Sequence, residues 1–452
     1  MCGIVGYIGH REAYPVILKG LKRLEYRGYD SAGVALIGNE TLKVYKKKGM
    51  VSELEDEVVG KDAHANIGIG HTRWATHGEP SDRNAHPHVS NSGELALIHN
   101  GIIENYVLIK QELLKKGYTF KSDTDSEVLL NFIEDIKKNN NCTLEEALRV
   151  ALKRIVGAYC ILLIDVNAPT TIIAARKGSP LVIGIGKDEH FLASDASPII
   201  EYTKEVVYIN DYEIAIVRND ELILKNLGNE KQTPYITKLD MDLAEIEKGG
   251  YEHFMLKEIH EQPESIHDCL RGRLLSHEGK IVMGGIEQHI EALKNAPRII
   301  IVACGTSWHA GLVAEYVFEE LCRIPVEVEY ASEFRYRNPV IHKGDVIIAI
   351  SQSGETADTL VALESAKEKG AFIFGVVNAV GSSIARLSHA GAYTHAGPEI
   401  GVASTKAFTG QLAVLMMMAL KIGYAKGTIT HERYLQLMKD LEAVPEKVKT
   451  IL

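Results

Sequence analysis

The sequence predicts two unlike folding units, a layered α+β domain followed by an α/β domain with a parallel sheet. The chain has 452 residues, enough for two or three domains at about 100–200 residues each. Short apolar or alternating runs bounded by Gly, Asn or Asp fill the first half, and such runs are typical of strands. Regular alternation of strand and helix patterns begins only near residue 298, and this alternation indicates a parallel sheet.

The first half is expected to be rich in short strands, with helices between some of them. The strands are predicted at 3–9, 33–37, 66–74, 94–99, 159–165, 171–175, 181–185 and 206–209. Helical spacing of apolar residues predicts helices at 12–24, 105–116, 126–138 and 144–155. Because strands and helices come in runs, we expect layered packing of sheets and helices in this half.

The second half is expected to alternate strands and helices after a linker. Strands are predicted at 298–303, 326–329, 345–350 and 372–377, and helices at 308–322 and 357–369. In the first of these helices, we expect a buried stripe of Leu312, Val313, Tyr316, Val317 and Leu321. The predicted boundaries are 2–224 for the first domain, 225–290 for a linker with a helical hairpin, 291–430 for the second domain and 431–452 for a helical tail.

Composition excludes several classes of partner. The net charge of −10 argues against nucleic acid or an anionic membrane, since both need a basic face. The longest apolar run, 412–420, is too short to span a bilayer and predicts a buried helix. No secretory signal opens the sequence, and the six cysteines form no CxxC pair. A reducing, cytoplasmic setting is therefore expected.

Cys2 is a candidate nucleophile. Methionine is normally trimmed before a small residue, so Cys2 would carry both a thiol and a free amine. An amine with a pKa of about 7.7–8.0 can accept the thiol proton at neutral pH. The alternative is that Cys2 is only a small residue at a frayed end of the chain.

Two strand–loop–helix segments, 301–308 and 350–356, place hydroxyls where a strand ends and a helix begins. Helix N-termini bind phosphate through free backbone amides, and parallel sheets bind ligands at the carboxyl ends of strands. Neither segment is a Walker motif or a dinucleotide fingerprint. Simple helix capping is the alternative interpretation. The histidines at 71, 77, 86, 88 and 99 could indicate a metal site, but no acid or Cys lies at metal spacing, so we expect no metal and no cofactor.

Five segments together resemble the class II glutamine amidotransferases, and specifically those members that aminate a sugar phosphate. They are residues 2–6 (CGIVG), 23–33 (RLEYRGYDSAG), 71–78 (HTRWATHG), 99–101 (HNG) and 404–408 (STKAF). The resemblance covers nearly the whole chain. It implies a four-layer αββα N-terminal nucleophile glutaminase domain, followed by a sugar isomerase (SIS) domain.

The resemblance also implies a role for each residue of the glutamine site. Asn100 and Gly101 would form the oxyanion hole for the intermediate made by Cys2. Arg73 would bind the α-carboxylate of glutamine, and Asp125 the α-ammonium, with Asp123 as the alternative. The remaining expected contacts are Arg27, which orients the terminal residue, Thr76 and His77, which line the pocket, and Trp74, which gates an ammonia channel.

In the SIS domain the resemblance implies a site for fructose 6-phosphate. The sugar phosphate would be held by Thr306, Ser351, Gln352, Ser353 and Thr356, with Cys304, Gly305, Ser307, Val402, Ala403 and Ser404 alongside. The implied reaction uses glutamine and fructose 6-phosphate to make glucosamine 6-phosphate in a homodimer joined through the SIS domain.

A second SIS domain with the isomerase residues is expected to follow, so this chain alone is expected to retain glutaminase activity and sugar-phosphate binding. The alternative is a sugar-phosphate sensor with a vestigial glutaminase. Phosphoribosyl-binding and ATP pyrophosphatase loops, which other class II amidotransferases would need, are not seen in the sequence.

Overall fold

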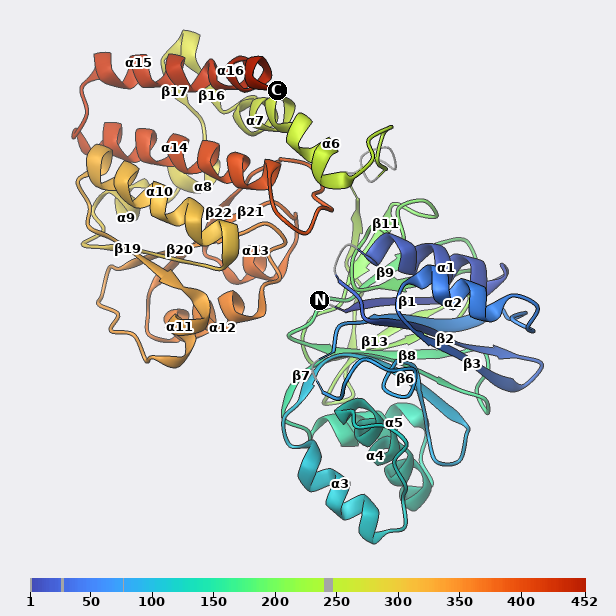
Figure 1. Ribbon diagram of the computed structural model, residues 1–452. Helices are drawn as coiled ribbons and strands as arrows, with labels where there is room; N and C mark the ends of the chain where they lie inside the picture. Colours follow the sequence, from blue (N-terminus) through green and yellow to red (C-terminus); the bar gives the residue numbers. More distant parts are fainter. Residues whose placement is uncertain (1, 26–27, 76, 240–246) are drawn as a thin grey trace. The chain divides into compact units, whose positions relative to one another are not determined.

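The computed structural model describes residues 2–25, 28–75, 77–239 and 247–452 (Figure 1). The chain divides into two compact units, Met1–Leu243 and Ala244–Leu452. Each unit has its own sheets and its own hydrophobic core, so each is described by itself.

Two antiparallel sheets form the centre of the first unit. The eight-stranded sheet has the order β15-β11-β9-β10-β1-β4-β2-β3, and the seven-stranded sheet has the order β14-β13-β12-β8-β7-β6-β5. The first contains β1 (Gly3–Ile8), β2 (Ser31–Gly38), β3 (Thr41–Lys48), β4 (Ile67–Arg73), β9 (Val182–Ile185), β10 (His190–Ala193), β11 (Glu205–Tyr208) and β15 (Ile236–Lys238). The second contains β5 (His88–Val89), β6 (Leu95–Ile103), β7 (Gly157–Asp165), β8 (Ile172–Lys177), β12 (Glu213–Val217), β13 (Leu222–Asn226) and β14 (Lys231–Gln232).

Helices cover the outer face of each sheet. In Figure 1, α1 (Ala13–Leu24) and α2 (Val51–Val58) lie outside the first sheet, while α3 (Tyr106–Lys115), α4 (Asp125–Asn140) and α5 (Leu144–Leu152) lie outside the second. One core, including Ile4 and Leu162, lies between the sheets, and another lies between the second sheet and α3–α5. The unit is therefore a four-layer αββα structure, and the fold predicted for the first half is confirmed.

The second unit is built on a five-stranded parallel sheet. Its order is β19-β18-β20-β21-β22, formed by β18 (Ile299–Ala303), β19 (Val326–Tyr330), β20 (Val346–Ser351), β21 (Phe372–Val377) and β22 (Ala390–Tyr393). Helices α10 (Gly305–Cys322) and α14 (Lys406–Lys426) pack on one face. Helices α11 (Ala331–Tyr336), α12 (Ala357–Glu368) and α13 (Ser383–Leu387) are on the other face. Side chains of β18 alternate between the two faces, as a strand covered on both sides requires.

Short elements and the C-terminal helices complete the second unit. They are α6 (Phe254–His260), α7 (Gln262–Leu270), β16 (Leu274–Leu275), a 3₁₀ turn (Ser276–Glu278), β17 (Lys280–Ile281), α8 (Gly284–Glu287), α9 (Ile290–Lys294), α15 (His431–Glu442) and α16 (Val444–Ile451). Glu261, between α6 and α7, has helical backbone angles, so the two helices follow one another without a loop.

The predicted buried stripe on α10 is wrong at its centre. Val313 and Tyr316 are 45% and 76% exposed, and the buried face instead carries Ala310, Gly311 and Ala314. A Cβ added at Gly311 would lie 2.9 Å from Ile301 of the sheet, so small residues are needed where the helix approaches the strands. Hydrophobicity alone could not distinguish this small-residue face from the larger apolar face opposite.

Helix α14 contains the longest apolar run. Its length and composition would allow it to cross a membrane, and 67% of its most apolar window is buried inside the unit. Met417, Met418 and Leu420 belong to the core beside the sheet. The interpretation of this segment as a buried helix agrees with the structure.

Candidate functional site

The two sheets of the first unit bring Cys2 and Asn100 together. Cys2 precedes β1, and Asn100 lies on β6 of the other sheet. The Asn100 Nδ2 donates to the Cys2 carbonyl at 3.1 Å, and the backbone N–H of Trp74 donates to Cys2 Sγ at 3.1 Å. Because β1 pairs with β4, with Gly3 opposite Thr72, the end of β4 carries Arg73 and Trp74 to the thiol. The structure thus places Asn100 and Trp74 in contact with Cys2, with Arg73 adjacent to Trp74 in the chain.

Gly101 occupies a backbone conformation that other residues rarely adopt. Its φ is +132°, and a Cβ at this position would lie 2.1 Å from the carbonyl oxygen of Ala158 on the neighbouring strand. Glycine is therefore required next to Asn100. The role of both residues as an oxyanion hole stays a prediction.

Arg73 offers a buried cation with unused donors. Its side chain is 5% exposed, and NH2 donates to the carbonyl oxygens of His77 and Gly78. NH1 lies 3.8 Å from Asp30 Oδ1 and has no hydrogen-bond partner among the described residues. A buried guanidinium that keeps donors free suits a planar carboxylate ligand.

Asp123 and Asp125, the two candidates for the glutamine α-ammonium, lie in different surroundings. Asp123 is half exposed, and its carboxylate accepts from Arg83. Asp125 is buried at the first residue of α4, where Oδ2 accepts from the backbone N–H of Ile103 at 2.8 Å. Ile103 is two residues after Gly101 on β6. Through this bond, Asp125 is attached to the strand that carries the predicted oxyanion hole. The arrangement favours Asp125, and its role remains a prediction.

The other predicted glutamine-site residues are less completely defined. Arg27 and Thr76 fall outside the described residues. The His77 ring lies 5.3 Å from that of Tyr106 in an edge-to-face contact. Trp74 is 55% exposed and packs against Gly28, where an added Cβ would lie 2.8 Å from the indole. The gating role of Trp74 therefore stays untested.

Histidines form a buried cluster next to Asn100. The rings of His71, His86 and His88 lie in a row, with centroids 4.3 and 4.7 Å apart in a tilted and an edge-to-face contact. Burial lowers the pKa of His71 to about 3 and holds the pKa values of His86 and His88 well below their usual range. No group of three or more His, Cys, Asp or Glu within the described ranges could hold a metal ion. The cluster is instead held together by hydrogen bonds, such as that of His88 Nε2 to Thr124 Oγ1 at 2.9 Å.

These histidines predict a loss of stability in acid. The unfolded state takes up protons below its histidine pKa of about 6.5, while the buried rings of the folded state stay neutral. The free energy of unfolding therefore falls by about 1.4 kcal/mol per pH unit for each such ring. Replacing His88 by Gln should make this slope shallower by about that amount between pH 6 and pH 5. Urea unfolding at each pH measures this slope. In a Trp308→Phe background, Trp74 fluorescence reports on the first unit alone.

The exposed His64, with an 84% exposed side chain, provides the control as His64→Gln, because it is hydrated in both states. An unchanged slope in His88→Gln would contradict the expected effect of burial.

The predicted sugar-phosphate residues lie at the carboxyl end of the parallel sheet. The strand order reverses between β18 and β20, since β19 lies to one side and β21 to the other. Ligands bind at such switch points in open α/β sheets. Ser351 ends β20, its Oγ accepts from the backbone N–H of Gly354 at 3.0 Å, and it lies 3.1 Å from Thr356 Oγ1. A Cβ at Gly354, where φ is +63°, would lie 2.0 Å from Ser382 Oγ.

The residues of the loop after β18, 304–307, differ in exposure and in their contacts. Thr306 is exposed at the start of α10, next to Gly305. Ser307 is buried, and its Oγ accepts from Gln411 of α14 at 3.0 Å, so it joins two helices. Cys304 Sγ lies 4.0 Å from Thr359 Oγ1. Cys304 thus contacts α12, and its place beside the sugar phosphate stays a prediction.

A third loop, residues 397–405, is tied to the strand ends by polar side chains that the sequence did not indicate. Asn378, after β21, donates to the Gly397 carbonyl at 2.6 Å. Glu258 accepts from the backbone N–H groups of Ile400 at 2.5 Å and Gly401 at 3.0 Å, although its burial raises its pKa. This loop carries Val402, Ala403 and Ser404, of which the first two are exposed. Gln352 and Ser353 lie in the loop after β20. The backbone carbonyl oxygen of Gln352 accepts from the backbone N–H of Asn378.

Ser351→Ala is expected to weaken fructose 6-phosphate binding about 10- to 100-fold, because it removes a predicted phosphate donor and a bond that shapes the loop. Glutamine hydrolysis should be unchanged, since the two units have separate cores. Calorimetric titration with fructose 6-phosphate measures the effect. Ser365→Ala, on α12 away from the loop, is the control, and equal affinity of both variants would contradict the placement of the site.

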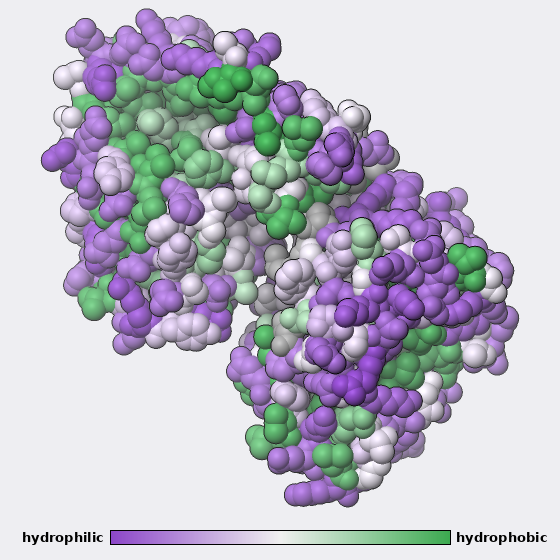
Figure 2. Space-filling model, in the orientation of Figure 1, coloured by the Kyte–Doolittle hydropathy of each residue, from purple (hydrophilic) through white to green (hydrophobic). Residues whose placement is uncertain are grey.

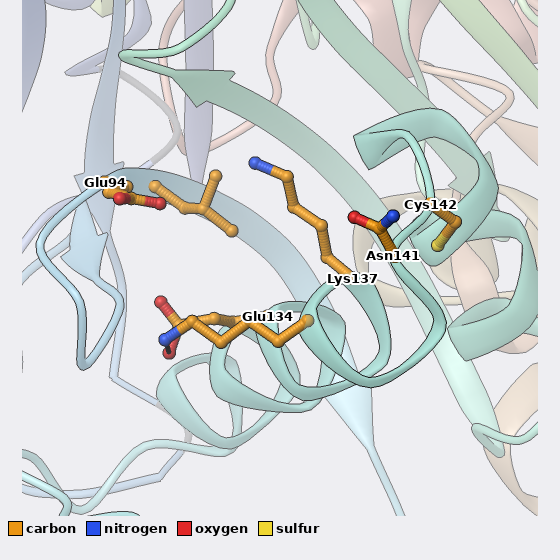
Figure 3. Close-up of a pocket in the computed structure, with 7 residues that line it drawn as sticks. Glu94, Glu134, Lys137, Asn141 and Cys142 are labelled. Carbon is orange, nitrogen blue, oxygen red and sulfur yellow. Dashed lines mark ion pairs between the residues drawn. The ribbon is translucent and has the colours of Figure 1, made fainter.

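Two clefts lie elsewhere on the units. The cleft in Figure 3, of about 200 Å³, is lined by Glu94, Leu95, Glu134, Lys137, Lys138, Asn141 and Cys142. Its lysines are already paired, Lys137 with Asp165 at 2.5 Å and Lys138 with Glu134 at 3.4 Å. A second cleft of about 300 Å³ is lined by Arg298 and residues 337–340. Neither contains a predicted site residue.

Comparisons with known proteins agree with this division. Residues 71–201 match the model of the glutamine amidotransferase domain, and residues 292–421 match the model of the SIS domain. The first unit, with its thiol where two sheets meet, is therefore a glutamine amidotransferase domain. The second unit, a parallel sheet with polar loops at its switch point, is a sugar isomerase domain.

Curated relatives identify the family. A protein of Bacteroides thetaiotaomicron, named glutamine–fructose-6-phosphate aminotransferase (isomerizing), is 60% identical over 454 residues, which cover 100% of this chain and 74% of the relative. A protein of the same name from Chlorobaculum tepidum is 58% identical over 456 residues, with the same coverage. The solved C-terminal domain of the glucosamine–fructose-6-phosphate aminotransferase of Francisella tularensis is 40% identical, with a TM-score of 0.42, and covers 44% of this chain and 56% of that chain. The chain belongs to the glutamine–fructose-6-phosphate aminotransferase family, which is a family of enzymes.

Proposed function

We propose that this chain releases ammonia from glutamine at Cys2 and holds fructose 6-phosphate in its second unit, as part of an enzyme that makes glucosamine 6-phosphate. The observation that carries the proposal is the meeting of Cys2 and Asn100 from opposite sheets, with a bond of 3.1 Å between them. A nucleophile and an oxyanion donor must lie together for acyl transfer. The names of the relatives support the choice of both substrates.

The proposed reaction follows from the residues around the thiol. The Cys2 thiolate attacks the amide carbon of glutamine, and the amide oxygen becomes an oxyanion that accepts hydrogen bonds from Asn100 Nδ2 and the Gly101 N–H. The intermediate collapses to a γ-glutamyl thioester as its C–N bond breaks, and the leaving nitrogen takes the proton that the Cys2 amine accepted from the thiol, so that ammonia departs. Water then attacks the thioester and regenerates the thiol with release of glutamate. The α-carboxylate of the substrate binds Arg73, and its α-ammonium binds Asp125.

Ammonia release from glutamine by the purified chain tests the proposal. We expect equal amounts of glutamate and ammonia, and an intact mass lower than that of the printed sequence by one methionine, so that Cys2 has a free amine. Full activity in protein that retains Met1 would contradict the use of the Cys2 amine as base. Absence of glutamate release, with fructose 6-phosphate still bound, would favour the sensor alternative.

The isomerase step is proposed to require more than these residues. We expect the chain alone to give no glucosamine 6-phosphate, because the family resemblance assigns the isomerase lysine, glutamate and histidine to none of these residues. An assay for glucosamine 6-phosphate with glutamine and fructose 6-phosphate checks this, and any enzymatic product would contradict it. A cytoplasmic location is proposed with the same function, since both substrates are small metabolites.

A homodimer through the second unit is the proposed assembly. Figure 2 shows hydrophobic surface gathered over α10 and α14 on this unit. Val313 and Tyr316 of α10 are exposed, and Phe408, Leu412 and Met416 are half-buried at four-residue spacing on α14. Exposed apolar patches mark contact surfaces. Light scattering should give twice the chain mass, and Tyr316→Glu should give a monomer. A monomeric wild type would contradict the assembly.

A further inference from the structure

The side chain of Asn100 is held by a line of buried histidines. His71, on β4, places Nε2 2.8 Å from Asn100 Oδ1. His86 places Nδ1 3.4 Å from the same His71 nitrogen, and the backbone N–H of His99 lies 3.5 Å from His86 Nδ1. All of these residues are buried. The line connects a fixed backbone group to the amide that faces Cys2.

The direction of each bond follows from the backbone end of the line. A backbone N–H can only donate, so His86 Nδ1 must accept and carries no hydrogen. His86 then cannot donate to His71, and the hydrogen between the two rings belongs to His71 Nε2. That hydrogen points mainly to Asn100 Oδ1, which is the nearer acceptor.

The second nitrogen of His71 agrees with this tautomer. His71 Nδ1 is buried and has no hydrogen-bond partner in the described part of the chain. In the Nε2–H tautomer, this nitrogen is an unsatisfied acceptor, and no N–H is left buried without an acceptor. Burial also lowers the pKa values of His71 and His86, which keeps both rings neutral.

A fixed tautomer fixes the orientation of the Asn100 amide. The two ends of an amide have nearly the same shape, and a flipped Asn100 would present its oxygen to the oxyanion and repel it. With Oδ1 occupied by the His71 N–H, Nδ2 must face Cys2, where it donates one hydrogen at 3.1 Å and has no second acceptor among the described residues. We propose that His71, set by His86, is a positioning residue that orients the Asn100 amide as an oxyanion donor. The inference rests on the proposed glutaminase function.

Variants at position 71 separate the donor from the ring. His71→Leu removes the donor, and we expect kcat for glutamine hydrolysis to fall about 10- to 100-fold with KM changed less than about threefold, since an oxyanion donor acts in the transition state. His71→Gln can place an N–H near the original Nε2, and we expect it to recover most of kcat. His190→Leu is the matched control, because His190 is a buried ring in the same unit whose Nδ1 bonds to the Arg218 carbonyl at 2.7 Å, far along β1 from Cys2.

A double variant distinguishes positioning from a general loss of packing. In an Asn100→Ala background, His71→Leu should lower kcat no further, because the amide that it orients is gone. Additive losses, or equal kcat for His71→Leu and the wild type, would overturn the proposal. Circular dichroism of each variant shows that it is folded.

The tautomer can be measured without any activity. Imidazole ¹⁵N shifts of the wild-type chain, assigned with His71→Gln, should show the Nε2–H form of His71 from pH 5.5 to pH 8. A Nδ1–H form would overturn the proposal even in active enzyme. If the wild type released no ammonia, the proposed function would fail, and the shifts would still decide the orientation of Asn100.

Discussion

Replacing Cys2 by Ala should lower kcat for glutamine hydrolysis by about 10⁴-fold or more, since it removes the atom that forms the covalent intermediate. The Asn100 bond to the Cys2 carbonyl uses the backbone, so the substitution leaves it in place. The first unit should therefore stay folded, and fructose 6-phosphate should bind the second unit with unchanged affinity. Glutamate release under saturating glutamine measures the loss.

The matched control for this prediction is Cys142→Ala. Cys142 is a half-buried thiol of the same unit that lines the cleft in Figure 3, and burial raises its pKa, which makes it a poor nucleophile. We expect its activity to equal that of the wild type. Residual activity of Cys2→Ala within tenfold of the wild type would show that another group attacks glutamine.

The elements of the fold were largely predictable because strands and helices differ in local pattern. The strand expected at 159–165 is β7, and the helix expected at 144–155 is α5, one turn shorter. Features set by packing were not predictable. The buried face of α10 is decided by how closely the helix must approach Ile301.

Site residues that belong to continuous segments were accessible from the sequence. Asn100 and Gly101 are adjacent, and Arg73 ends β4 with Trp74 directly after it. Residues that act through other side chains could not be predicted from the sequence, because their roles depend on which strands become neighbours. His71 and Asn100 belong to different sheets, and Glu258 reaches the loop at Ile400 from a helix 142 positions earlier. The nearest signal was the concentration of histidines between 71 and 99, for which a metal site was the alternative considered and which did not indicate a hydrogen-bonded line.

Arg73→Met should raise KM for glutamine by about 100-fold or more, because a buried charge pair contributes about 2–5 kcal/mol to binding. The effect should fall mainly on KM, since the α-carboxylate is bound equally in the ground and transition states. Arg73→Lys keeps the charge but loses the planar fork, so we expect an intermediate KM. Initial rates over a range of glutamine concentrations separate KM from kcat.

Arg83→Met provides the comparison for this prediction, because Arg83 lies in the same unit but is 56% exposed and pairs only with Asp123 among the described residues. Exposed ion pairs contribute about 0–1 kcal/mol, so KM should change by less than about fivefold. Arg73→Met also leaves Asp30 without its buried cation, and a melting curve distinguishes lost binding from lost folding. If a folded Arg73→Met variant kept the wild-type KM, the α-carboxylate would bind elsewhere. In that case, the free donors of Arg73 would serve the loop at His77 and Gly78, to which NH2 already donates.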